Sequence, residues 1–183
     1  LYWTMPTDTN PIFNLDTIVI VGPGLLGGSV ALGLKAAGHT GKVIGVARSQ
    51  STLDIAIQVG CIDQGTTDLV EAAKQADLIL LATPLKTFGD VMGQIADHLK
   101  PGCIITDVGS TKSSVLIDAH EQLKPEQLKY LVPSHPMAGS ETQGPAGASA
   151  QMLQTRPCIV TPLDQSDPKT VAEIKDMWDR IGM

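Results

Sequence analysis

Residues 18–27 read IVIVGPGLLG, and this stretch decides the fold of the chain. It opens with apolar residues only, as expected of a short strand that is buried on both faces of a parallel sheet. Residues 25–37 carry leucines and small residues at helical spacing, and the pattern stops at Gly38. The glycine-rich turn between the two segments therefore predicts a strand, a tight turn and a helix in immediate succession.

The same alternation of apolar strands and helices continues along the chain. We expect further strands at residues 43–47, 77–82, 103–106, 130–133 and 157–161, with Ile62 as a short third strand, and helices at residues 51–59, 68–75, 86–99, 113–123 and 168–181. Asp68 is the expected N-cap of its helix, and Asp167 or Ser166 that of the last one. This pattern predicts an α/β fold, a doubly wound, mostly parallel Rossmann-type sheet with helices on both faces.

Length and composition suit one such domain. The chain has 183 residues, of which 43% are hydrophobic and only 3% aromatic, so the core must consist mainly of Val, Ile, Leu and Ala. Residues 1–15 are rich in Thr, Pro and Asn and are expected to form a loose arm, and residues 16–183 a single domain. The start at Leu1 and the abrupt end at Met183 suggest a fragment of a longer protein.

Charge and hydropathy exclude several classes of partner. The net charge is -6 and the sequence contains no basic run, which argues against binding to nucleic acid or to an anionic membrane. No apolar run reaches the length of about 18 residues that suggests a membrane span. Residues 1–15 are polar and do not resemble a signal peptide.

The cysteines indicate neither disulfides nor a metal site. Cys61, Cys103 and Cys158 lie far apart and form no CxxC motif and no cluster with histidine, so we expect no bound metal. Cys61 and Cys103 have apolar neighbours and are expected to be buried thiols. A sparse, odd number of cysteines fits a protein of the reducing cytoplasm.

The glycines have the spacing Gly22-x-Gly24-x-x-Gly27 between a strand and a helix, which is the context of a dinucleotide-binding fingerprint. Gly22 permits the tight turn, Gly24 lets the backbone approach a pyrophosphate, and Gly27 allows the helix to pack closely on the strand. The pyrophosphate would lie at the helix N-terminus, beside Leu25 and Leu26, where N–H groups and the helix dipole favour an anion. The alternative is a plain tight turn, but the flanking pattern favours dinucleotide binding.

The end of the second expected strand favours NADP over NAD. NAD-binding proteins usually place an acidic residue about 20 residues beyond the fingerprint, where it binds the ribose 2′-hydroxyl. Residues 28–53 contain no acidic residue, and Arg48 and Ser49 could instead bind a 2′-phosphate. The alternatives are that Arg48 is an ordinary solvated charge and that NAD is also used.

Polar side chains follow several of the expected strands, at the edge where doubly wound folds bind their ligands. Thr83 and Pro84 are placed to meet the nicotinamide half of the cofactor, and Ser110 lies on a turn after a strand. His135 is followed by Pro136, which biases it to an extended conformation, and its imidazole could act as a general base. The other histidines, His39, His98 and His120, lie on or beside helices without a motif and are expected to be structural.

Together these motifs resemble the N-terminal, nucleotide-binding part of prephenate/arogenate dehydrogenases. The resemblance covers residues 16–183, the expected dinucleotide-binding domain, and rests on VGPGLLGGS at residues 21–29, TDVGSTK at residues 106–112 and SHPMAGSE at residues 134–141. The first motif is generic and the second is shared with β-hydroxyacid dehydrogenases. The third motif is the specific one.

The resemblance implies an NAD(P)-dependent oxidative decarboxylation of prephenate or arogenate in tyrosine biosynthesis. His135 would accept the hydrogen bond or proton of the 4-hydroxyl group as a hydride leaves the ring. Ser110 would hydrogen-bond to His135 and orient it, and Glu141 would lie at the mouth of the site. These roles fit the residue types, and general-base assistance is typically worth about 10² to 10⁴ in rate.

The chain departs from the family pattern in its length. Family members continue into a helical second domain that forms a homodimer and supplies an arginine for the substrate carboxylates. That domain is absent here, and neither Arg156 nor Arg180 is assigned to the substrate. Two alternatives stay open: another NADP oxidoreductase of the β-hydroxyacid or imine type, and a non-catalytic NADP-sensing module.

Overall fold

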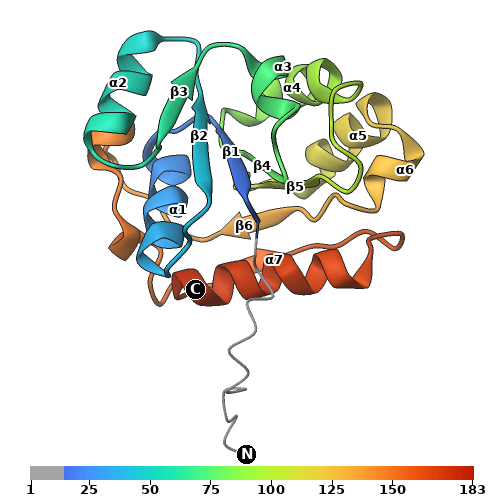
Figure 1. Ribbon diagram of the computed structural model, residues 1–183. Helices are drawn as coiled ribbons and strands as arrows, with labels where there is room; N and C mark the ends of the chain where they lie inside the picture. The colour runs from blue at the N-terminus through green and yellow to red at the C-terminus, as the bar shows by residue number, and fades with distance from the viewer. Residues whose placement is uncertain (1–14) are drawn as a thin grey trace, which may run out of the picture.

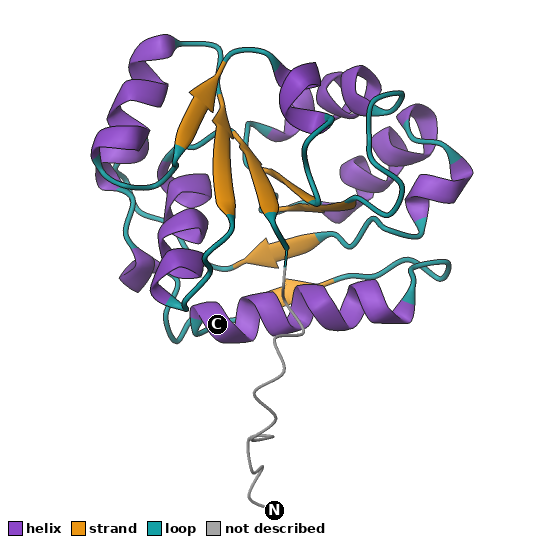
Figure 2. Cartoon of the chain, in the orientation of Figure 1, coloured by secondary structure: helices purple, strands orange, loops and turns teal. Residues whose placement is uncertain are grey.

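The computed structural model describes residues 15–183, so the expected arm at residues 1–15 lies almost entirely outside the described residues. Its main sheet consists of β1 (Thr17–Val21), β2 (Lys42–Val46), β3 (Gln64–Thr66), β4 (Leu78–Leu81) and β5 (Ile104–Asp107). All neighbouring strands are parallel, in the order β3-β2-β1-β4-β5 (Figure 1, Figure 2). The strand order changes direction between β1 and β4, and ligands bind doubly wound sheets at such a switch point.

Helices cover both faces of this sheet because successive strand residues point to opposite sides. The helices are α1 (Leu25–Ala36), α2 (Gln50–Gln58), α3 (Leu69–Ala73), α4 (Phe88–Ile95), α5 (Lys112–Gln122), α6 (Pro125–Leu128) and α7 (Pro168–Ile181), with 3₁₀ turns η1 (Leu85–Thr87), η2 (Pro145–Gly147) and η3 (Ala150–Met152). Ile20 and Leu80 join the hydrophobic cluster with α1, α2 and α7, whereas Val21 and Leu81 join the cluster with α3, α4 and α5. The expected doubly wound α/β fold is therefore confirmed.

A second, two-stranded sheet follows the main one. It pairs β6 (Ser134–Pro136) with β7 (Cys158–Val160) in antiparallel fashion. The strand expected at residues 130–133 is reduced to a single parallel bridge between Leu131 and Ile105, so that prediction was wrong. Pro133 has no N–H to donate to a ladder, and regular pairing resumes only at Ser134. His135 consequently lies on a strand rather than in the loop after one.

Two further expectations on secondary structure need correction, and one helix was missed. The third strand lies at Gln64–Thr66 and not at Ile62, whose apolar side chain is buried in the core at 2% exposure. The helix expected at residues 86–99 is divided into η1 and α4 and ends at Ile95. Helix α6, which begins with Pro125, was not expected at all.

The two predicted helix caps and the predicted burial of two cysteines are confirmed. The Asp68 carboxylate accepts a hydrogen bond from the Glu71 N–H at the start of α3, and that of Asp167 accepts one from the Thr170 N–H at the start of α7. Cys61 and Cys103 are buried. Among the helices of residues 15–183, none has the length and apolar character that a membrane crossing requires.

Candidate active site

The glycine turn after β1 has the geometry expected of a dinucleotide fingerprint. Gly22 adopts a φ of +91°, and a Cβ atom there would lie 2.9 Å from the backbone of Ala82. A Cβ atom at Gly27 would lie 2.4 Å from the Gly22 carbonyl oxygen, so only glycine lets α1 approach the turn this closely. Gly24 differs, because no atom lies within 4 Å of the position of its Cβ. The space above Gly24, at the N-terminus of α1, is open to a ligand.

The residues expected to hold the rest of the cofactor lie at the carboxyl ends of neighbouring strands. Arg48 and Ser49 follow β2 and are exposed, and Arg48 forms no ion pair with any residue of the described chain. Thr83 and Pro84 follow β4, beside the glycine turn, and the Thr83 hydroxyl accepts a hydrogen bond from Thr87 at 2.8 Å. The structure thus brings the residues after β2 and those after β4 to the edge of the sheet that carries the glycine turn.

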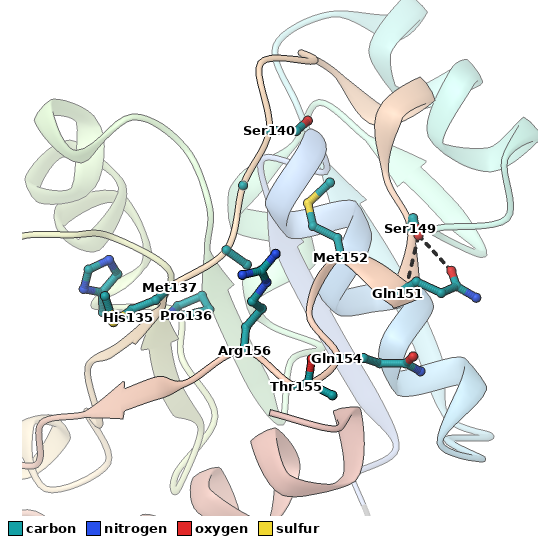
Figure 3. Close-up of a pocket in the computed structure, with 12 residues that line it drawn as sticks. His135, Pro136, Met137, Ser140, Ser149, Gln151, Met152, Gln154, Thr155 and Arg156 are labelled. Atoms are coloured by element: carbon teal, nitrogen blue, oxygen red, sulfur yellow. Dashed lines mark hydrogen bonds between the residues drawn. The ribbon is translucent and has the colours of Figure 1, made fainter.

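The strand β6 presents His135 to a pocket. Ser134 and Pro136 are buried, and His135 between them is half-buried on the opposite side of the strand. The pocket has a volume of about 940 Å³ and extends from β6 past Ser140 to η3 and the turn that follows η3 (Figure 3). His135 thus lies in the lining of this pocket.

The pocket also contains an arginine to which the sequence assigned no role. Arg156 lines it together with His135, and Figure 3 shows the Arg156 side chain extending between Met137 and Met152. None of the described residues that line the pocket is an Asp or a Glu, and Arg156 forms no ion pair within residues 15–183. Thr155, just before it, has a φ of +63°, which is uncommon outside glycine. Only the turn between η3 and β7 brings Arg156 here, and no sequence motif signals that turn.

Two of the expected catalytic residues lie apart from the pocket lining. Ser110 is exposed on the turn after β5, and Glu141 is exposed beyond Ser140. No hydrogen bond joins Ser110 to His135 within the part of the chain that the structure describes. The roles of both residues in catalysis therefore stay predictions.

A buried ion pair behind the site was not predicted from the sequence. The Lys112 ammonium group donates hydrogen bonds to the Asp107 carboxylate and to the Ser134 carbonyl oxygen. Burial raises the pKa of the Asp107 carboxyl group, although Lys112 and the N–H groups of Gly109 and Ser134 oppose the shift. The only sequence signal was that Asp107 and Lys112 flank Ser110 within the motif TDVGSTK.

Burial also shifts the pKa of the Cys158 thiol, which lies near Asp107 and Lys112. Cys158 on β7 pairs with Pro136 on β6, and burial raises the pKa of its thiol to about 12. At neutral pH the thiol is therefore protonated and a poor nucleophile. His135, not Cys158, is the candidate for acid–base chemistry on this small sheet.

Comparison with known proteins gives the family. Residues 30–183 match the family model described as prephenate dehydrogenase, nucleotide-binding domain. This chain belongs to that family. The resemblance in its sequence motifs is thereby confirmed.

Individual relatives agree with this assignment. Cyclohexadienyl dehydrogenase of Zymomonas mobilis is 37% identical over 165 residues, which are 90% of this chain and 55% of that protein. Prephenate dehydrogenase of Bacillus subtilis is 34% identical over 88% of this chain and 43% of its own length. The structure of A. aeolicus prephenate dehydrogenase in complex with hydroxyphenyl propionate and NAD+ superposes with a TM-score of 0.84 at 29% identity, over 91% of this chain and 57% of that one. The chain thus spans about half the length of the relatives it matches.

Proposed function

We propose that this chain is the cofactor-binding part of an enzyme that oxidatively decarboxylates prephenate or arogenate with a nicotinamide cofactor. The observation that carries the proposal is His135, presented by β6 to an open pocket at the carboxyl edge of the sheet. Family membership supports the choice of reaction, because the relatives are named for prephenate, cyclohexadienyl or arogenate.

The residues of the glycine turn fit a dinucleotide. The open space above Gly24 and the N–H groups at the start of α1 would hold the pyrophosphate. Thr83 and Pro84 would lie against the nicotinamide, which accepts a hydride from the substrate. Arg48 and Ser49 would hold a 2′-phosphate, so we propose that NADP is preferred and that NAD remains usable.

The chemistry requires a group that takes the proton of the substrate 4-hydroxyl. The His135 imidazole is proposed to accept this proton while the hydride leaves C4, so that the hydroxyl becomes a carbonyl. The bond between the ring and its carboxylate then breaks and CO2 leaves; the electron pair of that bond makes the ring aromatic, and the carbonyl oxygen takes the proton back from His135 to become a phenol. Ser110 would orient His135 and Glu141 would act at the mouth of the site.

The charge of the pocket supports an acidic substrate. Prephenate and arogenate both carry carboxylates, and the pocket offers Arg156 with no acidic residue in its described lining. A pocket lining with one positive charge and no negative charge attracts anions locally, although the whole chain has a net charge of -6. We propose that Arg156 contributes to anion attraction.

In the complete protein we propose a helical second domain that forms a homodimer and provides further ligands for the substrate. The three well-separated free thiols support a reducing, cytoplasmic location. Neither a nucleic acid nor a membrane is expected as a partner, given the acidic composition.

The test is an assay of the complete gene product with prephenate and with arogenate, each with NADP and with NAD. We expect reduction of the cofactor with a higher kcat/KM for NADP. His135→Asn should lower kcat by about 10² to 10⁴, the usual range for loss of a general base, while the Kd of the cofactor stays unchanged. His120→Asn on α5 is the matched control and should keep full activity. Full turnover by His135→Asn would refute the catalytic role, and an equal or higher kcat/KM with NAD would refute the cofactor preference.

A further inference from the structure

Ser134, the residue before His135, is held by side chains at each of its polar atoms. Its N–H donates to the Asp107 carboxylate at 3.1 Å, and its carbonyl oxygen accepts from the Lys112 ammonium group. Its hydroxyl lies 3.0 Å from the Trp178 indole N–H, which donates to it, and 3.0 Å from the Thr106 hydroxyl. Ser134 is fully buried, so water cannot replace any of these partners.

The Asp107 carboxylate joins the two segments that carry the proposed catalytic residues. One of its oxygens accepts from the Ser134 N–H on the strand of His135. The other accepts from the Gly109 N–H, at 2.8 Å, on the turn of Ser110. A single rigid group thus sets the separation between the turn and the strand.

Stability alone does not account for this pair. The Asp107 side chain is 0% exposed and that of Lys112 15%, so both charges lose most of their hydration. A buried ion pair is often no more stabilising than apolar residues of the same volume, because desolvation offsets the attraction. Apolar residues, however, could not form the hydrogen bonds that Asp107 and Lys112 make with Ser134 and Gly109.

We propose that Asp107, Lys112 and Ser134 are positioning residues that align His135 with the Ser110 turn. The proposal rests on the proposed function, since it assumes that His135 acts on the substrate. It assigns the three residues no contact with substrate or cofactor. The proposal also includes Trp178 on helix α7, whose indole N–H donates a hydrogen bond to the Ser134 hydroxyl.

The double variant Asp107→Asn/Lys112→Met tests the proposal in the complete gene product. A side-chain amide has only one accepting atom, so the substituted side chain can accept from Ser134 or from Gly109 but not from both as the carboxylate does. The double variant leaves no unpaired buried charge, and we expect it to unfold at a higher temperature than Lys112→Met alone. We expect its kcat to fall by about 10- to 100-fold, as for a small misplacement of reacting groups, with the Kd of the cofactor within about 2-fold of wild type.

Matched variants separate positioning from stability. Lys35→Met removes an ion pair of similar design, in which Asp63 also accepts from the Val43 N–H, and should leave kcat unchanged. Trp178→Phe keeps an aromatic ring but removes the bond to Ser134, and should lower kcat less than the double variant does. It also serves as the test if the double variant does not fold.

The outcomes distinguish this inference from the proposed function. An inactive wild type with every substrate and cofactor pair would refute the proposed function. An active wild type whose folded double variant, or Trp178→Phe, has wild-type kcat would refute the positioning role alone. The double variant is also compared with Lys112→Met alone. If both its thermal stability and its kcat were restored relative to that single variant, the ion pair would be only structural, and the positioning role would be refuted.

Discussion

At the scale of single residues, glycine occupies the three fingerprint positions for different physical reasons. Gly22 needs a positive φ and Gly27 needs close packing, so both are required for the fold itself. Gly24 is the α1 N-cap with a φ of -85° and a ψ of -148°, a combination outside the usual regions for residues with a side chain, although the space around it is open. Glycine at this N-cap thus suits the backbone, and the open space beside it suits the proposed pyrophosphate position.

This contrast gives a prediction for two alanine variants. Gly24→Ala should raise the Kd of the dinucleotide at least about 10-fold, because its methyl group would occupy the proposed space of the pyrophosphate, and should lower thermal stability less than Gly27→Ala does. Gly27→Ala should lower the melting temperature, because its Cβ would lie 2.4 Å from the Gly22 oxygen. Calorimetric titration and thermal unfolding measure the two effects. Unchanged cofactor affinity in Gly24→Ala would contradict the proposed pyrophosphate position.

At the scale of elements, helix α7 depends on the cap that its sequence predicted. The Asp167 carboxylate accepts bonds from the Thr170 N–H and hydroxyl, and these bonds lower the pKa of Asp167. Because the folded-state pKa is lowered, the carboxylate stabilises the fold above its ordinary pKa of 3.8. That contribution is lost as the pH falls through the lowered value.

We therefore expect Asp167→Ala to melt at a lower temperature than wild type at pH 7. The difference should narrow when the pH falls below 3.8. Asp164→Ala is the control, because Asp164 is exposed and is not hydrogen-bonded to any described residue. Thermal unfolding followed by circular dichroism at both pH values measures this. A difference that is constant with pH would argue against a charge-dependent cap.

Elements were predicted well where the pattern was local and poorly where it was not. Strand β1 follows from its run of apolar residues, and helix α7 follows from its apolar periodicity and its cap. The prediction of a strand at Ile62 was wrong because an apolar residue signals burial in the core, not a particular backbone conformation. A residue of a strand and a residue of a buried turn can both be apolar for this reason. The position of β6 depended on pairing with β7, a partner more than 20 residues away in the sequence.

At the scale of the whole molecule, one sheet supports two hydrophobic clusters. Leu80 belongs to the cluster under α1 and α7, and its neighbour Leu81 to the cluster under α3, α4 and α5. Both side chains are fully buried. A cavity on either face therefore weakens a sheet that both layers share.

We expect Leu80→Ala to lower the free energy of unfolding by about 2–5 kcal/mol, the usual cost of such a cavity. Unfolding should remain a single transition, because the two layers share the sheet. Ile117→Ala, at a side chain that is 59% exposed, should change stability by less than about 0.5 kcal/mol. Urea denaturation followed by fluorescence and by circular dichroism measures both variants. Separate transitions in Leu80→Ala would show that the layers unfold independently.

The sequence by itself determined the α/β class, the dinucleotide turn and the family, because each depends on residues that are close together in the chain. Only the tertiary structure placed Arg156 in the pocket of His135 and joined Asp107 and Lys112 to Ser134. Those contacts link residues from different elements, and their strength comes from burial that no local pattern reveals.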